Sequence, residues 1–102
     1  MKEVILSHDS EAKLYLVPDE VAEDLAAYCW DFAANWLWKS PHAKKYHKSI
    51  NGVDGVIFGA PDFIDYLNEW LFPDQPSVLV KGLGCYDYEL PEEYTDYPKY
   101  NF

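Results

Sequence analysis

Residues 18–38, with the sequence PDEVAEDLAAYCWDFAANWLW, decide the fold class of this 102-residue chain. Apolar side chains recur in this stretch at spacings of three and four, which is the period of an α-helix. Pro18 suits the first helical position, and the acidic residues behind it suit the positive end of the helix dipole. Pro41 ends the predicted helix. The apolar stripe expected along it is Val21, Leu25, Tyr28, Cys29, Phe32 and Trp36.

A second, shorter helix is predicted over residues 61–72. Pro61 and Asp62 suit its first turn, and Pro73 ends it. Its apolar residues again follow the helical period. The two stripes together predict that both helices pack on one face of a sheet. The side chains expected to make this contact are Leu25, Phe32, Trp36, Phe63, Leu67 and Trp70.

Short runs rich in β-formers lie before, between and after the two helices. The predicted strands cover residues 3–6, 13–17, 56–58, 77–83 and 85–90. Asn51 and Gly52 are a strong hairpin signal. The order β-β-α-β-α-β-β predicts a small α+β domain, with a mostly antiparallel sheet and two helices packed on one face. We expect this domain to cover residues 1–90, and residues 91–102 to form a tail that is either draped over the body or loose.

Composition limits the class of protein. Apolar residues make up 49% of the chain and aromatic residues 18%, so one domain can bury a real core. The net charge is −10, and all eight basic residues are Lys, which disfavours nucleic acid and an anionic membrane surface as direct partners. Cys29 and Cys85 follow no metal-binding or disulfide pattern. With no signal peptide and no long apolar run, we predict a cytoplasmic chain that needs no cofactor.

The acidic residues are the strongest functional signal. Both predicted helices place acids opposite their apolar stripes, and the C-terminal segment interleaves acids with Tyr. Such a surface attracts a basic partner at long range, and Tyr rings supply contact area. We therefore predict a non-enzymatic binding protein that docks onto the basic site of a partner protein, as an inhibitor or a nucleic-acid mimic. The residues predicted to bind the partner are Glu20, Glu23, Asp24, Asp31, Glu92, Glu93, Tyr94, Asp96 and Tyr97.

The acidic bias is similar to that of phage-encoded inhibitors of restriction or CRISPR enzymes, and of immunity proteins for nuclease toxins. The similarity is one of composition and covers no motif. It implies a nucleic-acid-processing enzyme or a toxin as the partner. Two interpretations stay open beside it, because net negative charge also keeps small proteins soluble and the C-terminal Tyr rings can instead pack on the domain.

The histidines support an alternative function. His42 and His47 lie five positions apart and are flanked by Lys residues, at a spacing that does not place two metal ligands on one helical face. We therefore predict no metal site. The alternative is a small enzyme or metal-binding protein that uses His42, His47 and carboxylates, or a housekeeping domain with a small-ligand cleft.

Two further groups of residues have competing interpretations. Lys39, Lys44, Lys45 and Lys48 form a basic island in the acidic chain, and we favour neutralisation by nearby carboxylates over a docking role. Trp30 and Trp38 lie eight positions apart on one side of the first predicted helix. We favour burial of both rings over an exposed aromatic patch, because large aromatic residues are mostly buried.

Overall fold

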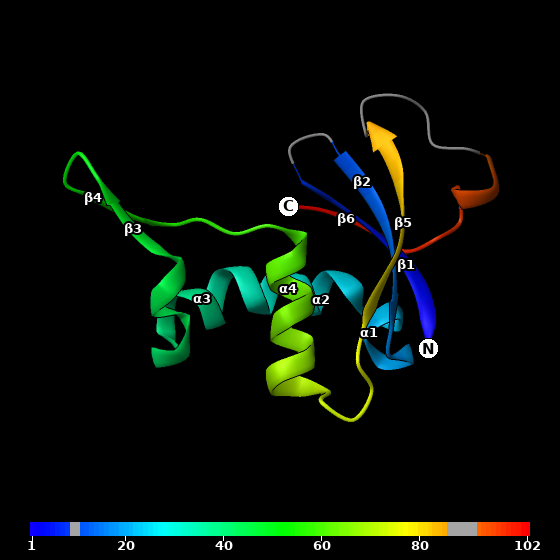
Figure 1. Cartoon of the computed structure of the whole chain (residues 1–102), viewed down its shortest axis with the longest axis horizontal. Helices are drawn as coiled ribbons and strands as arrows, with labels where there is room; N and C mark the ends of the chain where they lie inside the picture. The colour runs from blue at the N-terminus through cyan, green and yellow to red at the C-terminus, as the bar shows by residue number, and fades with distance from the viewer. Residues whose placement is uncertain (9–10, 86–91) are drawn as a thin grey trace.

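A four-stranded sheet forms one layer of the molecule, and the helices cover one of its faces (Figure 1). The structure is a computed structural model that describes residues 1–8, 11–85 and 92–102. The strand order is β5-β2-β1-β6, and neighbours run antiparallel except for β1 and β6. The strands are β1 (Lys2–His8), β2 (Glu11–Val17), β5 (Val78–Cys85) and β6 (Lys99–Asn101). The predicted α+β class with a mostly antiparallel sheet is confirmed.

The strand β1 lies inside the sheet and is covered on both faces. Val4 and Leu6 pack under the helices, whereas Ile5 faces the opposite side of the sheet. All three side chains are fully buried, as expected for a continuous apolar run between two layers. The pairing with β2 runs from Lys2–Val17 to His8–Glu11, so the predicted first hairpin is confirmed and is longer than expected.

The C-terminal segment covers the second face of the sheet. The short helix η4 (Glu92–Tyr94) places the Tyr94 ring against the cluster that contains Ile5 and Leu14. The strand β6 then pairs with β1 in parallel, with Leu6 opposite Tyr100. Residues 92–102 are therefore draped over the body, which was one of the two expected arrangements, and they also complete the sheet.

The strand β5 forms the other edge of the sheet. It runs continuously through Gly82 and Gly84, and its pairing with β2 shifts register twice. Gly84 has a φ of +89°, which Gly adopts readily, and one of the two register shifts lies where Gly84 and Gly82 pair with Ala12 and Lys13. The predicted strand over residues 85–90 lies, apart from Cys85, outside the described residues.

The first predicted helix consists of four successive helical segments between Asp19 and Lys39, which together are called the rod. They are α1 (Asp19–Glu23), α2 (Leu25–Asp31), the π-turn η1 (Phe32–Trp36) and α3 (Leu37–Lys39). In η1 the Leu37 N–H donates to the Phe32 carbonyl, five residues back instead of four. This wider turn moves the buried stripe by one residue, so Leu37 is fully buried and Trp36 is only half-buried.

The prediction that Trp30 and Trp38 are buried was wrong. Their side chains are 65% and 49% exposed. In a regular α-helix, positions eight apart are rotated by roughly 80° relative to each other, at about 100° per residue. Trp30 precedes the π-turn and is exposed on α2, whose buried residues are Leu25 and Cys29. The π-turn then takes up an extra residue before Trp38, which changes the side of the rod on which this second ring lies.

The second helix contains the same irregularity. It consists of α4 (Ala60–Tyr66) and the π-turn η3 (Leu67–Leu71), in which the Phe72 N–H donates to the Leu67 carbonyl at 2.7 Å. Phe63 and Leu67 are fully buried as predicted. Trp70 is 44% exposed, so its predicted place in the buried stripe was wrong. Within residues 1–8, 11–85 and 92–102, no helix is both long and apolar enough to cross a membrane.

The segment that connects the two helices in the sequence contains a small hairpin, which projects from the body of the molecule (Figure 1). The hairpin follows the 3₁₀ helix η2 (Pro41–Tyr46) and consists of β3 (His47–Ile50) and β4 (Val53–Val56). The turn residues Asn51 and Gly52 both have positive φ, as an Asn-Gly hairpin requires. The strand predicted over residues 56–58 is therefore displaced to β4, because this turn determines which residues pair.

Cys29 provides a test of how tightly this core is closed. Its side chain is fully buried, and burial raises the pKa of its thiol to about 12. Alkylating reagents attack the thiolate, which is then scarce at pH 8. We expect Cys29 in a Cys85→Ser variant to resist iodoacetamide at pH 8 in the native protein and to react fully in 6 M guanidinium, as measured by mass spectrometry. Native Cys29 that reacts as fast as free cysteine would contradict the buried position.

Candidate functional site

The predicted partner-binding acids of the first helical rod are all exposed to solvent. Glu20, Glu23, Asp24 and Asp31 are all exposed on α1 and α2 or at the junction between them. Lys2 Nζ donates to Glu23 at 3.0 Å, and the Asn35 amide donates to Asp31 at 2.9 Å. Burial, and then the nearby carboxylates of Glu20 and Asp24, raise the pKa of Tyr28.

The acids of the C-terminal segment lie on the opposite face of the sheet from this rod. Glu92, Glu93 and Asp96 are exposed there. Tyr94 is only 6% exposed, and its ring packs edge-to-face on half-buried Tyr97 at 5.2 Å. The structure thus divides the predicted partner-binding residues between two surfaces and removes Tyr94 as an exposed anchor.

Trp30 lies on α2, on the same rod as the first of these two groups of acids. Its neighbours three and four positions away along the helix are all small, namely Ala26, Ala27, Ala33 and Ala34. The indole is 65% exposed, with Asp31 next to it in the sequence and the α1 acids seven or more residues before it. An exposed aromatic ring within a charged rim is the usual arrangement of a protein-binding hot spot.

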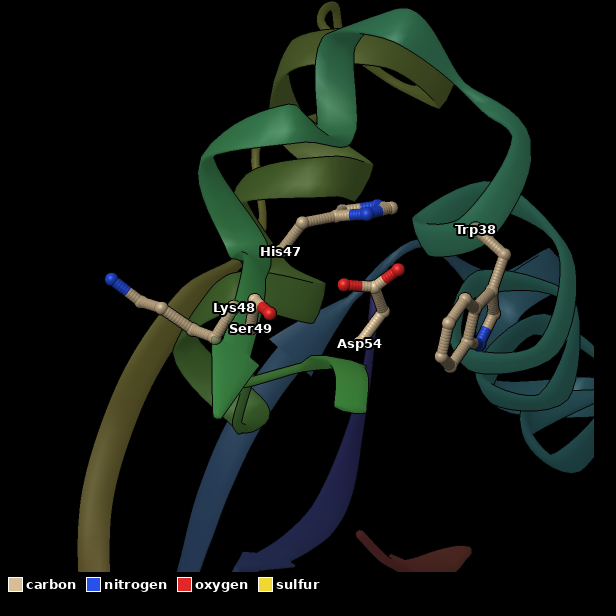
Figure 2. Close-up of a pocket in the computed structure, with 5 residues that line it drawn as sticks. All are labelled: Trp38, His47, Lys48, Ser49 and Asp54. Carbon is tan, nitrogen blue, oxygen red and sulfur yellow. The ribbon is translucent and has the colours of Figure 1, made fainter. Parts of the chain in front are cut away.

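Trp38, the second exposed ring of the rod, forms one side of a pocket of about 470 Å³ (Figure 2). The hairpin supplies the other lining residues, which are His47, Lys48, Ser49 and Asp54. Ser49 pairs directly with Asp54 across the two strands, and His47 lies two residues before Ser49. These three side chains therefore project from the same face of the hairpin.

The imidazole of His47 is held in place by the rod. Its Nε2 lies 2.5 Å from the Leu37 carbonyl oxygen, and its ring contacts Trp38 edge-to-face at 6.0 Å. A carbonyl oxygen can only accept a hydrogen bond, so Nε2 is the donor and Nδ1 of the neutral ring is an acceptor. Figure 2 shows the Asp54 carboxylate below the His47 ring and on the same side of it as Trp38, with the Lys48 side chain directed the other way.

His47, Ser49 and Asp54 are the residue types of a hydrolase triad, but their geometry does not suit that chemistry. A triad uses both imidazole nitrogens, one toward the Ser hydroxyl and one toward the carboxylate. Here Nε2 is already bonded to the Leu37 carbonyl. The arrangement is better suited to binding than to proton transfer between Ser49 and Asp54.

The structure does not bring His42 and His47 together. The His42 ring stacks on Trp70 at 4.2 Å, whereas His47 contacts Leu37 and Trp38. In the part of the chain that the structure describes, no three His, Cys, Asp or Glu side chains form a group that could hold a metal ion.

One Lys of the basic island lies close to carboxylates of the second helix. The Tyr46 hydroxyl, and then the carboxylates of Glu69 and Asp65, raise the pKa of Lys45. Lys45 Nζ also lies 5.1 Å from the centre of the Tyr46 ring. These contacts are those expected if the island is neutralised locally.

Ser49 and Asp54 are pocket residues that the sequence interpretation missed. The Asn-Gly turn was recognised, but no strand was predicted before it and the strand after it was placed at residues 56–58. Counting outward from Asn51 and Gly52 pairs Ser49 with Asp54, so the hairpin signal could have identified both. No protein-family model, curated protein or solved structure matches the chain, so the function is argued from these surfaces.

Proposed function

We propose that this is a non-enzymatic binding protein that docks onto the basic site of a partner protein through its first helical rod. The observation that carries the proposal is the exposure of Trp30. Its side chain is 65% exposed, and its neighbours three and four positions away along the helix are all Ala. An exposed ring of this size in a polar surface is typical of an interaction site. The exposed carboxylates of Glu20, Asp24 and Asp31 on the same rod favour a basic partner.

The charge of the whole chain supports the same choice of partner. At −10, the protein attracts a cationic surface from a distance and repels an anionic one. An enzyme or toxin that processes nucleic acid has such a surface where it binds phosphates. Carboxylates on the rod would then occupy phosphate positions, and the protein would act as an inhibitor. In this arrangement the acids speed the encounter and Trp30 holds the complex.

Trp30→Ala tests the proposal. The partner is first captured from a lysate of the cells that make the protein, eluted by rising salt, identified by mass spectrometry and purified. We expect Trp30→Ala to weaken its binding by about 30-fold or more, because a central aromatic hot spot contributes about 2 kcal/mol or more. Calorimetric titration measures the dissociation constant, and the exposed position of Trp30 should leave folding unchanged.

Trp70→Ala is the matched control, because it also removes an exposed indole but on the second helix. It should bind the partner within about threefold of the wild type. Equal losses in both variants, or a Trp30→Ala protein that binds as tightly as the wild type, would contradict docking through the rod. A captured partner whose binding does not respond to salt would contradict a basic site.

A further inference from the structure

We propose that the pocket formed by Trp38 and the β3–β4 hairpin receives the guanidinium group of an Arg side chain on the partner protein. The inference rests on the proposed function, and it adds the chemical identity of one contact beside the Trp30 surface. Trp38, His47 and Asp54 carry the argument.

The aromatic side of the pocket suits a planar cation. The Trp38 side chain is 49% exposed, and the His47 ring packs against it at an interplanar angle of 68°. Arg guanidinium groups stack on indole faces within about 6 Å of the ring centre, and Trp is the best aromatic partner for this contact. Trp38 therefore offers a fixed surface on which a guanidinium can lie.

The polar side of the pocket supplies hydrogen-bond acceptors. The Asp54 carboxylate lies next to Trp38 in Figure 2, and the Ser49 hydroxyl is across the strand pair from it. Because His47 donates through Nε2 to Leu37, its Nδ1 is an acceptor in the neutral ring. A guanidinium presents five N–H donors in a rigid plane and accepts none, so it matches this set.

The orientation of the two charged side chains that line the pocket favours a cation over an anion beside Trp38. Asp54 contributes a carboxylate beside Trp38, whereas the Lys48 ammonium is directed away from it (Figure 2). A phosphate or carboxylate ligand would meet the Asp54 charge at the place where it needs a donor. The protein as a whole is also strongly acidic.

The exposure of the pocket indicates that the cation belongs to a protein. All five lining residues are exposed, so a small ligand would remain largely in water. Small-molecule sites usually bury about 70–90% of their ligand. An Arg on a partner that is already held at Trp30 needs no such enclosure. Trp30 and Trp38 lie eight residues apart on one rod, roughly 12 Å along its axis, which is well within one interface of about 800 Å² per partner.

The test is a titration of the full chain with N-acetyl-arginine amide at constant ionic strength, followed by ¹H–¹⁵N NMR. We expect saturable shifts of the Trp38 indole N–H and of the Ser49 and Asp54 amides. N-acetyl-citrulline amide has nearly the same shape without the charge and should bind at least tenfold more weakly. N-acetyl-lysine amide should also bind more weakly than the Arg compound. Equal shifts with the citrulline compound, or no saturable shift at these three positions, would overturn the proposal.

Asp54→Asn should weaken binding of the Arg compound at least fivefold, and Trp38→Leu provides a second variant on the other side of the pocket. Asp74→Asn is the matched control, since it removes the same charge from an exposed residue after the second helix. It should bind like the wild type, and an equal loss would show a general charge effect and overturn the pocket. Each variant is first compared with the wild type by its backbone amide spectrum.

The two proposals can fail separately. If Trp30→Ala loses the purified partner but the Arg compound does not shift the pocket resonances, docking through the rod stands and the Arg pocket is wrong. If the compound binds at Trp38 but Trp30→Ala keeps the partner, the pocket binds a guanidinium and the proposed docking surface is wrong.

Discussion

Phe32→Ala should lower the free energy of unfolding by about 3–5 kcal/mol, the usual cost of truncating a fully buried Phe. Phe32 is 0% exposed and lies at the centre of the aromatic core. The rings that surround it within 5.0–5.8 Å belong to Trp36, Phe58, Phe63 and Tyr66. Removing the ring opens a cavity between the rod, α4 and the segment before α4, and these elements cannot all close around an Ala.

Urea denaturation followed by circular dichroism measures the loss. Phe72→Ala is the matched control, because it makes the same truncation at a half-buried ring that packs on Tyr28 at 6.1 Å. Its loss should be clearly smaller. If Phe32→Ala is unfolded in water, Phe32→Leu keeps the experiment quantitative with a smaller cavity. A loss no greater than that of Phe72→Ala would contradict the central position of Phe32.

If the proposed function is right, the triple variant Glu20→Lys, Asp24→Lys and Asp31→Lys should slow association with the captured partner by about 10- to 100-fold at low salt, because it reverses the charge of the proposed docking surface. The dissociation rate should change much less. Glu23 is left in place because it already pairs with Lys2. The difference from the wild type should shrink as salt rises, since exposed charges are screened beyond about 8 Å at physiological ionic strength.

The variant Glu92→Lys, Glu93→Lys and Asp96→Lys is the control for this experiment. It changes the net charge by the same amount, from −10 to −4, but on the opposite face of the sheet. Stopped-flow association with the purified partner between 50 and 500 mM salt compares the two. Equal slowing would mean that only net charge matters. Rates indifferent to both variants would leave the acids as a solubility device and contradict the proposed function.

Local patterns in the sequence were enough to predict most of the secondary structure. The spacing of Leu25, Phe32, Phe63 and Leu67 predicted both helices and their buried sides, because a helix repeats every 3.6 residues whatever surrounds it. The prolines marked the helix ends to within a residue or two, because proline lacks the N–H that a continuing helix needs. The acidic outer surface of the rod followed from the same period.

The exposure of the tryptophan rings after the first turns of the helices depended on features with no simple local signal. The π-turns η1 and η3 changed the phase of both helices, and Trp38 and Trp70, which follow or lie in these turns, are exposed. Whether such a turn forms depends on how Leu37 and Phe72 fit the core, and this is a tertiary contact.

The helices and the first hairpin arise from residues a few positions apart, and the acidic character follows from composition, so all three could be predicted from the amino-acid sequence. The parallel pairing of β6 with β1, the burial of Tyr94 and the pocket between Trp38 and Asp54 came only with the packed structure. These features join residues that are distant in the chain. Their formation depends on which surfaces remain to be covered once the sheet and helices have packed, and no local period records that.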